Sequence, residues 1–128
     1  MGIFSFSGKR PQNLGVKEGK LAACPNSPNC VNSQSTDKEH QIEPLPDVEI
    51  ATIKQIIAGM ERTKIIEVTD NYLYAEFSSK LMGFVDDVEF YRDDNAKVVQ
   101  VRSASRLGKS DLGVNRQRIE AIRAKLQG

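Results

Sequence analysis

The sequence predicts an α+β fold, in which a four-stranded antiparallel meander carries two helices on one face and follows a long irregular N-terminal arm. Two observations favour this class. From residue 47 to residue 126 the apolar residues follow a helical period, then four short alternating stretches, then a helical period again. All 5 prolines lie within residues 1–46, a stretch that shows neither period.

The arm and the meander together make up 128 residues, which is the length of one domain. A structureless stretch as long as this arm is unusual inside a compact domain, so we expect part of it to pack on the rest. The sequence therefore predicts a flexible tail over residues 1–13 and a single α+β domain over residues 14–128.

Both helices are predicted by apolar residues that recur every three or four positions. The first is expected to begin at about Asp47, which serves as its N-cap, and to end at Gly59. The second is expected to begin at about Asp111, with Ser110 as its N-cap. The apolar stripe of this second helix consists of Leu112, Ile119, Ile122 and Leu126.

The first hairpin of the meander is predicted over residues 64–69 and 72–78, joined by a two-residue turn. This turn sets Val68 opposite Leu73 and Ile66 opposite Ala75, which brings apolar side chains together on one face.

The second hairpin is predicted over residues 87–92 and 97–105. Its turn sets three pairs opposite each other, namely Phe90 and Val99, Val88 and Val101, and Asp87 and Arg102. The expected core of the sheet consists of Ile66, Val68, Leu73, Ala75, Phe77, Val88, Phe90, Val99 and Val101.

The opposite face of the sheet collects all three tyrosines among charged side chains, because side chains alternate along a strand. Its members are Tyr72, Tyr74, Glu76, Asp87, Glu89, Tyr91, Gln100, Arg102 and Arg106. Such a face either binds a partner or ligand, or lies beneath the arm as an ordinary polar face. We favour the second interpretation, since antiparallel sheets commonly have one polar face.

Composition excludes little. The formal net charge is +1, so we expect no nucleic-acid partner. Residues 67–96 carry eight acidic side chains and residues 97–128 carry eight basic ones, and we expect these blocks to pair with each other.

No stretch reaches the ~20 apolar residues of a transmembrane helix, and Met1–Phe6 is too short for a signal-peptide core. We therefore expect a cytoplasmic protein without a transmembrane segment.

The segment from Cys24 to Cys30 is the most distinctive part of the arm. The two cysteines are either closed in a disulfide or present as thiols, and thiols are the default in the cytosol. With His40, the only histidine, they also form an incomplete zinc set, because structural zinc takes four ligands. A third interpretation pairs a cysteine nucleophile with His40 as its base.

Two further groups carry possible chemistry. Asp86 and Asp87 are adjacent, but alternation sends them to opposite faces, and we expect Asp87 to pair with Arg102. An anion such as phosphate fits a site formed by Arg106, Lys109 and the helix N-terminus near Ser110, where the Asp111 carboxylate competes for the same position.

Four segments in this order resemble domain-of-unknown-function family 1499: residues 24–31, 83–90, 102–108 and 110–116. The resemblance covers about residues 14–126, and members of that family are bacterial and plant or plastid proteins of similar length. The family has no established activity, so the resemblance implies none. Some of its members look exported or lipid-anchored, which implies a disulfide between Cys24 and Cys30.

Our leading hypothesis is a non-enzymatic binding or assembly module without a cofactor, whose partner is another protein or a small anionic ligand. Its ligand-binding residues would be Cys24, Asn29, Cys30, Asp86, Arg106, Asn115 and Arg116. A buried polar network that seats the arm would use similar residues, with Asn29, Asn115 and Arg116 holding backbone. The alternative function is a thiol-dependent enzyme or redox sensor that uses Cys24 and Cys30 with His40.

Overall fold

A computed structural model describes residues 8–79, 84–108 and 110–128. Its strands and helices in chain order are β1 (Cys30–Asn32), β2 (Leu45–Pro46), α1 (Ile50–Ala58), β3 (Thr63–Val68), β4 (Tyr72–Ser78), β5 (Val85–Asp93), β6 (Val98–Ser105) and α2 (Val114–Gln127). The α+β class and the two helices are confirmed.

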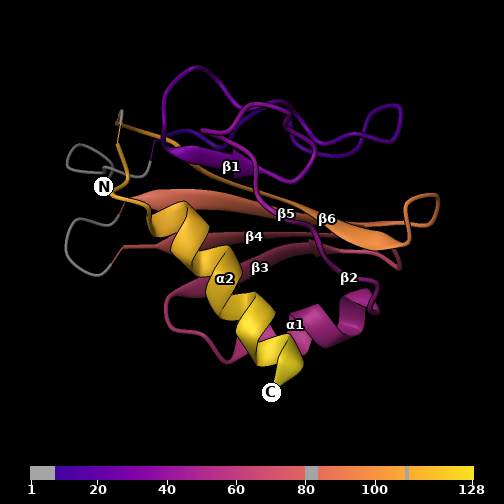
Figure 1. The fold of residues 1–128 in the computed structure, drawn as a ribbon. Coiled ribbons are helices and arrows are strands. Elements are labelled where there is room, and N and C mark those ends of the chain that lie inside the picture. The colour runs from indigo at the N-terminus through magenta and orange to yellow at the C-terminus, as the bar shows by residue number, and fades with distance from the viewer. Residues whose placement is uncertain (1–7, 80–83, 109) are drawn as a thin grey trace.

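The sheet of the described chain has six strands, so the expected count of four is wrong. The antiparallel meander β3–β4–β5–β6 is present, and the arm adds β1 and β2, which both pair with β6. Without them β6 would be an open edge with unpaired backbone groups, which proteins usually cover. Figure 1 shows β1 along the sheet with loops of the arm above it, and β2 farther down, near α1.

The first hairpin confirms one predicted pair and corrects the other. Val68 lies opposite Leu73, but Ala75 faces Ile65, because the register shifts between Ile65 and Glu67. A bulge inserts one extra residue and turns it to the other face. Ile66 therefore packs among the tyrosines rather than in the expected core, and Val68 is 40% exposed.

The second hairpin pairs two residues away from the predicted register, with Phe90 opposite Val101, Val88 opposite Ser103 and Asp87 opposite Ala104. The reason is that β5 continues to Asp93, whose carboxylate accepts the N–H groups of Asn95 and Ala96 within the turn. A shift of two keeps every side chain on its predicted face.

Both helices begin later than expected. Helix α1 starts after Glu49, and Asp47 pairs instead with Arg92 at 2.9 Å. Helix α2 starts after Gly113, whose φ of 81° suits glycine. The Asp111 carboxylate accepts hydrogen bonds from the N–H groups of Gly113 and Asn115, so Ser110 is not the N-cap. Leu112 precedes the helix and is exposed, so it is not part of the predicted apolar stripe.

The helices lie on one face of the sheet, and the first part of the arm lies on the other (Figure 1). The main core lies on the helix face and contains Val31, Ile42, Leu45, Ile50, Ile53, Ile57, Leu73, Ala75, Phe77, Val88, Phe90, Val99, Val101, Ile119 and Ile122. On the other face Leu14, Val16 and Leu21 of the arm pack on Tyr72 and Tyr74, which confirms that the arm covers the tyrosine face.

Of the predicted tail, residues 1–7 lie outside the described residues. Arg10 contacts the sheet through its ion pair with Glu76 at 2.7 Å, and the boundary at residue 13 stays a prediction. None of the helices in the described ranges is both long and apolar enough to cross a membrane.

Candidate functional site

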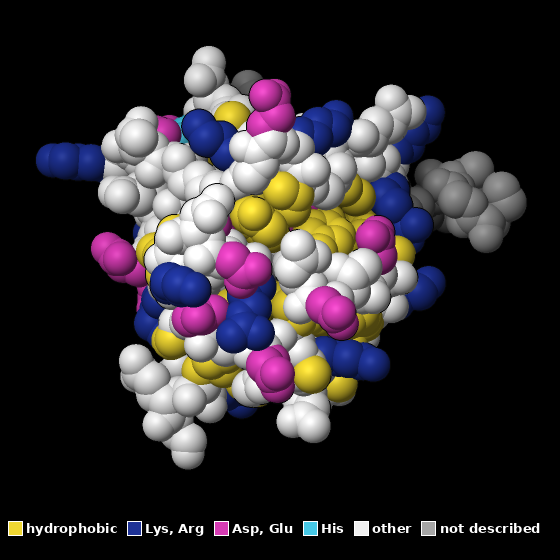
Figure 2. Space-filling model, turned by 90° about the vertical axis from the view of Figure 1, so that its right-hand side faces the viewer, with side chains coloured by type: hydrophobic (Ala, Val, Ile, Leu, Met, Phe, Trp, Pro, Cys, Tyr) yellow, Lys and Arg dark blue, Asp and Glu magenta, His cyan; other side chains and the backbone are white. Residues whose placement is uncertain are grey.

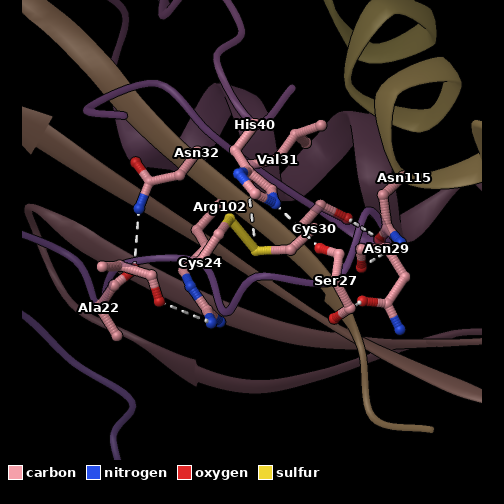
Figure 3. The surroundings of a disulfide bond; sticks show 12 residues. Ala22, Cys24, Ser27, Asn29, Cys30, Val31, Asn32, His40, Arg102 and Asn115 are labelled. Atoms are coloured by element: carbon pink, nitrogen blue, oxygen red, sulfur yellow. Dashed lines mark hydrogen bonds between the residues drawn. A yellow bond between two sulfur atoms is a disulfide. The ribbon is translucent and has the colours of Figure 1, made fainter. Parts of the chain in front are cut away.

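Cys24 and Cys30 are joined in a disulfide (Figure 3). Cys30 belongs to β1 and is fully buried, whereas Cys24 lies in the loop that precedes it. A disulfide offers no thiolate to a metal, so the zinc set of these cysteines with His40 does not exist in this form.

His40 lies against the disulfide loop (Figure 3). Its Nε2 contacts the Ser27 carbonyl at 2.9 Å and its Nδ1 contacts the Asp37 carboxylate at 2.6 Å. Both partners accept hydrogen bonds, which favours the doubly protonated ring. The hydrogen bond to Ser27 raises the pKa of His40, burial opposes it, and Asp37 adds to the rise. His40 therefore links the loop between the two cysteines to Asp37.

A group of possible metal ligands surrounds this histidine. Ligand atoms of Asp37, Glu39 and His40 all lie within 4.8 Å of one another. Both carboxylates are exposed, and both ring nitrogens of His40 already contact protein atoms, so the group carries no metal assignment.

The sheet divides the predicted polar site into separate parts. Asn29, Asp86 and Asn115 meet on the helix face, while Arg106 contacts side chains on the arm face. Arg116 lies apart and donates to the Gln41 and Glu39 carbonyls at 2.7 and 3.2 Å. The ligand-binding role of these residues stays a prediction.

Asn115 is the centre of the helix-face group. Its Nδ2 donates to the Asn29 carbonyl at 3.2 Å, Ser105 Oγ at 2.9 Å and Asp111 Oδ2 at 2.7 Å. Its Oδ1 accepts from Ser103 Oγ at 2.6 Å and Arg118 Nη1 at 2.9 Å. The fully buried side chain thus ties the disulfide loop, β6 and α2 together.

Arg118 completes this group and was missed from the sequence. Its Nη2 lies 2.7 Å from Asp86 Oδ2, and its guanidinium lies 4.8 Å from the centre of the Phe77 ring. The sequence feature that could have identified Arg118 is its three-residue spacing from Asn115, which places both side chains on one face of the helix.

On the arm face Arg106 pairs with Asp87 through two hydrogen bonds of 2.9 Å, which corrects the predicted pair of Asp87 with Arg102. Arg106 also donates to Glu76 at 2.7 Å, and the Tyr74 hydroxyl donates to Asp87. In the predicted anion site, therefore, Arg106 already holds carboxylates, Asp111 fills the helix N-terminus, and Lys109 lies outside the described residues.

Glu89 lies fully buried under the arm. Its Oε2 accepts from the Tyr72 hydroxyl and from the Gly15 N–H at 2.7 Å, whereas its buried Oε1 has no partner. Burial raises the pKa of Glu89 above its ordinary value of 4.5. It also raises the pKa values of Tyr72 and Tyr74, so both hydroxyls stay neutral.

We predict that Glu89→Gln changes how stability depends on pH. Above the ordinary pKa of 4.5 and up to its raised folded pKa, the folded protein holds more protons on Glu89 than the unfolded chain. Stability therefore falls as pH rises through this window, and the amide abolishes that loss. In urea titrations over a pH series, the free energy of unfolding of Glu89→Gln should rise relative to that of the parent protein as pH rises. A difference that stays constant with pH would contradict the assignment.

A hollow opens between the arm and strands β3 and β4, with a volume of about 570 Å³. We call it the tyrosine hollow, and it is lined by Arg10, Leu14, Gly15, Val16, Ile66, Glu67, Thr69, Asn71, Tyr72, Tyr74 and Tyr91. Figure 2 views the molecule from the side of the β3–β4 turn and shows hydrophobic side chains gathered in a hollow beneath the arm.

Comparison with known proteins gives a family match. A family model described as "Protein of unknown function (DUF1499)" matches residues 20–126. No curated protein and no solved structure matches the chain.

Proposed function

Because the chain belongs to the DUF1499 family, whose description assigns no activity, we propose a function from the site itself: a non-enzymatic binding module that holds a small organic ligand in the tyrosine hollow. The observation that carries this proposal is the hollow, whose volume of about 570 Å³ lies in the usual range for small-molecule sites.

The polar side chains that could carry out catalysis are already bound to other protein groups, which supports a binding role. The two cysteines are oxidised, and both nitrogens of His40 contact the loop and Asp37. Asp86 and Asp87 are each held by an arginine. Each of these groups would have to give up a structural contact before it could take or give a proton.

The floor of the hollow suits a flat apolar molecule. The hydroxyls of Tyr72 and Tyr74, which are 7% and 2% exposed, donate to Glu89 and Asp87, and the partly exposed Tyr91 supplies the open aromatic surface of the hollow. Val16 and Ile66 supply aliphatic walls from the arm and the bulge. Aromatic rings bind other rings by stacking and by edge-to-face contact.

The rim suggests a ligand without net charge. Arg10 and Glu67 stand on it with opposite charges, and Arg10 already pairs with Glu76. Thr69 and Asn71 offer neutral hydrogen-bonding groups. We therefore take a neutral aromatic compound with one polar group as the ligand class.

Indole is a suitable probe, because it has this chemistry and the chain contains no tryptophan. Carbon–proton spectra of the aromatic rings should show saturable shifts of Tyr72 and Tyr91. Ile66→Gln should weaken binding about fivefold, the effect of losing roughly 1 kcal/mol of apolar contact. Val68→Gln, on the same strand but outside the hollow, is the matched control. Equal affinities in both variants, or no saturable shift, would refute the proposal.

The second candidate, a thiol-dependent enzyme or redox sensor, is favoured by the position of the disulfide, which ties the preceding loop to β1 at the edge of the sheet. Counting thiols in the denatured protein before and after mild reduction tests it. Cysteines that stay oxidised until the chain unfolds would argue against a redox role.

A further inference from the structure

We propose that a separate hollow beside β6 binds a small oxyanion through Arg102. This arginine hollow has a volume of about 280 Å³, and it is lined by Lys9, Pro11, Asn13, Pro25, Asp87, Arg102, Ala104, Ser105 and Arg106. It shares no lining residue with the tyrosine hollow and does not depend on the function proposed above.

Arg102 is a buried cation with few partners. The residue is 5% exposed, and its buried Nε has no hydrogen-bond partner. Its Nη2 donates a long hydrogen bond of 3.4 Å to the Ala23 carbonyl, beside the disulfide (Figure 3). Within residues 8–79, 84–108 and 110–128, the ion pairs that form at this face join Arg106 and Arg10 to carboxylates and leave Arg102 without one.

An unpaired charge in this position is costly. Removing a cation from water without a counter-ion bonded to it is strongly unfavourable. Burial accordingly lowers the pKa of Arg102, against the opposing charges of Glu89 and Asp87, although an arginine stays charged. An anion bound beside Arg102 would offset this cost, so we expect Arg102 to favour anion binding.

Glu89 is an alternative counter-ion, since it lies opposite Arg102 on β5. Its Oε1 also lacks a partner; burial raises the pKa of Glu89, and the charge of Arg102 acts against that rise. A water between the two side chains would satisfy both orphan atoms. A water carries no charge, whereas an oxyanion in the hollow would add negative charge beside the guanidinium.

Charges around the arginine hollow favour an anion. Three cations, Lys9, Arg102 and Arg106, face one carboxylate, Asp87. Arg106 already holds that carboxylate in two hydrogen bonds of 2.9 Å, so the excess positive charge comes from Lys9 and Arg102. Guanidinium groups bind carboxylate and phosphate oxygens with strong directional hydrogen bonds. The modest volume restricts the ligand to a small oxyanion.

The test follows the Nε–H resonance of Arg102 by NMR while inorganic phosphate or acetate is added at constant ionic strength. The expected result is a saturable shift of this resonance. A stronger response to phosphate identifies a tetrahedral oxyanion, and a stronger response to acetate identifies a carboxylate. No saturable shift with either anion would overturn the proposal and leave the water bridge to Glu89 as the explanation.

Variants separate a built site from general attraction. Followed by backbone amide shifts around the hollow, Arg102→Gln should weaken binding at least about tenfold. Lys9→Gln, at an exposed position, should weaken it about threefold through the loss of one charge. Arg92→Gln, an arginine outside the hollow, is the control and should bind as the parent does. Equal weakening in Arg92→Gln and Arg102→Gln would refute a specific site. Indole binding should survive Arg102→Gln, so the two proposals fail separately.

Discussion

Arg106→Met should lower the free energy of unfolding by about 3–5 kcal/mol, the usual cost of removing one partner from a buried ion pair. The Arg106 side chain is 7% exposed and its partner Asp87 is 1% exposed. Methionine fills much of the same volume, so the loss would come from charge and hydrogen bonding rather than from a cavity.

The size of this effect depends on what is left behind. Asp87 would keep the Tyr74 hydroxyl as a donor but lose both hydrogen bonds from the guanidinium. Burial works to raise the pKa of Glu76, but hydrogen bonds from Arg10, Arg106 and Tyr74 hold it below 4.5, and Glu76 would lose one of its two arginines. Two carboxylates would then face each other under the arm without the cation between them.

Arg10→Met is the matched control, because Arg10 contacts the same Glu76 from a side chain that is 50% exposed. Exposed ion pairs contribute little, so this variant should stay close to the parent in urea titrations. Similar losses in both variants would show that Arg106 is no more important than a surface charge. Asp87→Asn in the Arg106→Met background should restore part of the stability, since it removes the uncompensated carboxylate.

The order of elements and the two faces of the sheet could be predicted from the sequence, because alternation survives errors of register. The second hairpin was placed two residues away, and Phe90 and Val101 still fell on the core face. The bulge at Ile66 was not predictable in this way, since one inserted residue leaves the apolar pattern unchanged until the partner strand is known.

The candidate site was predictable only as a set of residue types. Sequence singled out Asn29, Asn115 and Arg106, but spacing alone did not show that the sheet would separate them. It also did not show that the arm would supply β1 and β2, because strands of two or three residues carry no period. Arg102 was placed correctly on the arm face, yet its lack of a carboxylate partner depends on the register that was wrong by two.

Asn115→Ala should cost about 3 kcal/mol, because it leaves several buried polar groups without partners at once. The Asn29 carbonyl, Ser103 Oγ and Ser105 Oγ would each lose a hydrogen bond at the junction of the disulfide loop, β6 and α2. Gln117→Ala, an exposed position on the same helix, should stay within about 0.5 kcal/mol of the parent.

Asn115→Asp distinguishes hydrogen bonding from packing at this junction. The aspartate has nearly the same shape as asparagine but replaces the donor Nδ2 with an acceptor that faces the Asp111 carboxylate, now 2.7 Å away. Like charges at this distance repel, and protonation relieves the repulsion. Urea titrations should therefore show a deficit for Asn115→Asp that is largest at neutral pH and shrinks in acid. A deficit that does not change with pH, and that equals the loss in Asn115→Ala, would mean that the site is sensitive only to shape. In that case the hydrogen bonds from Asn115 to the disulfide loop would not be what holds the loop in place.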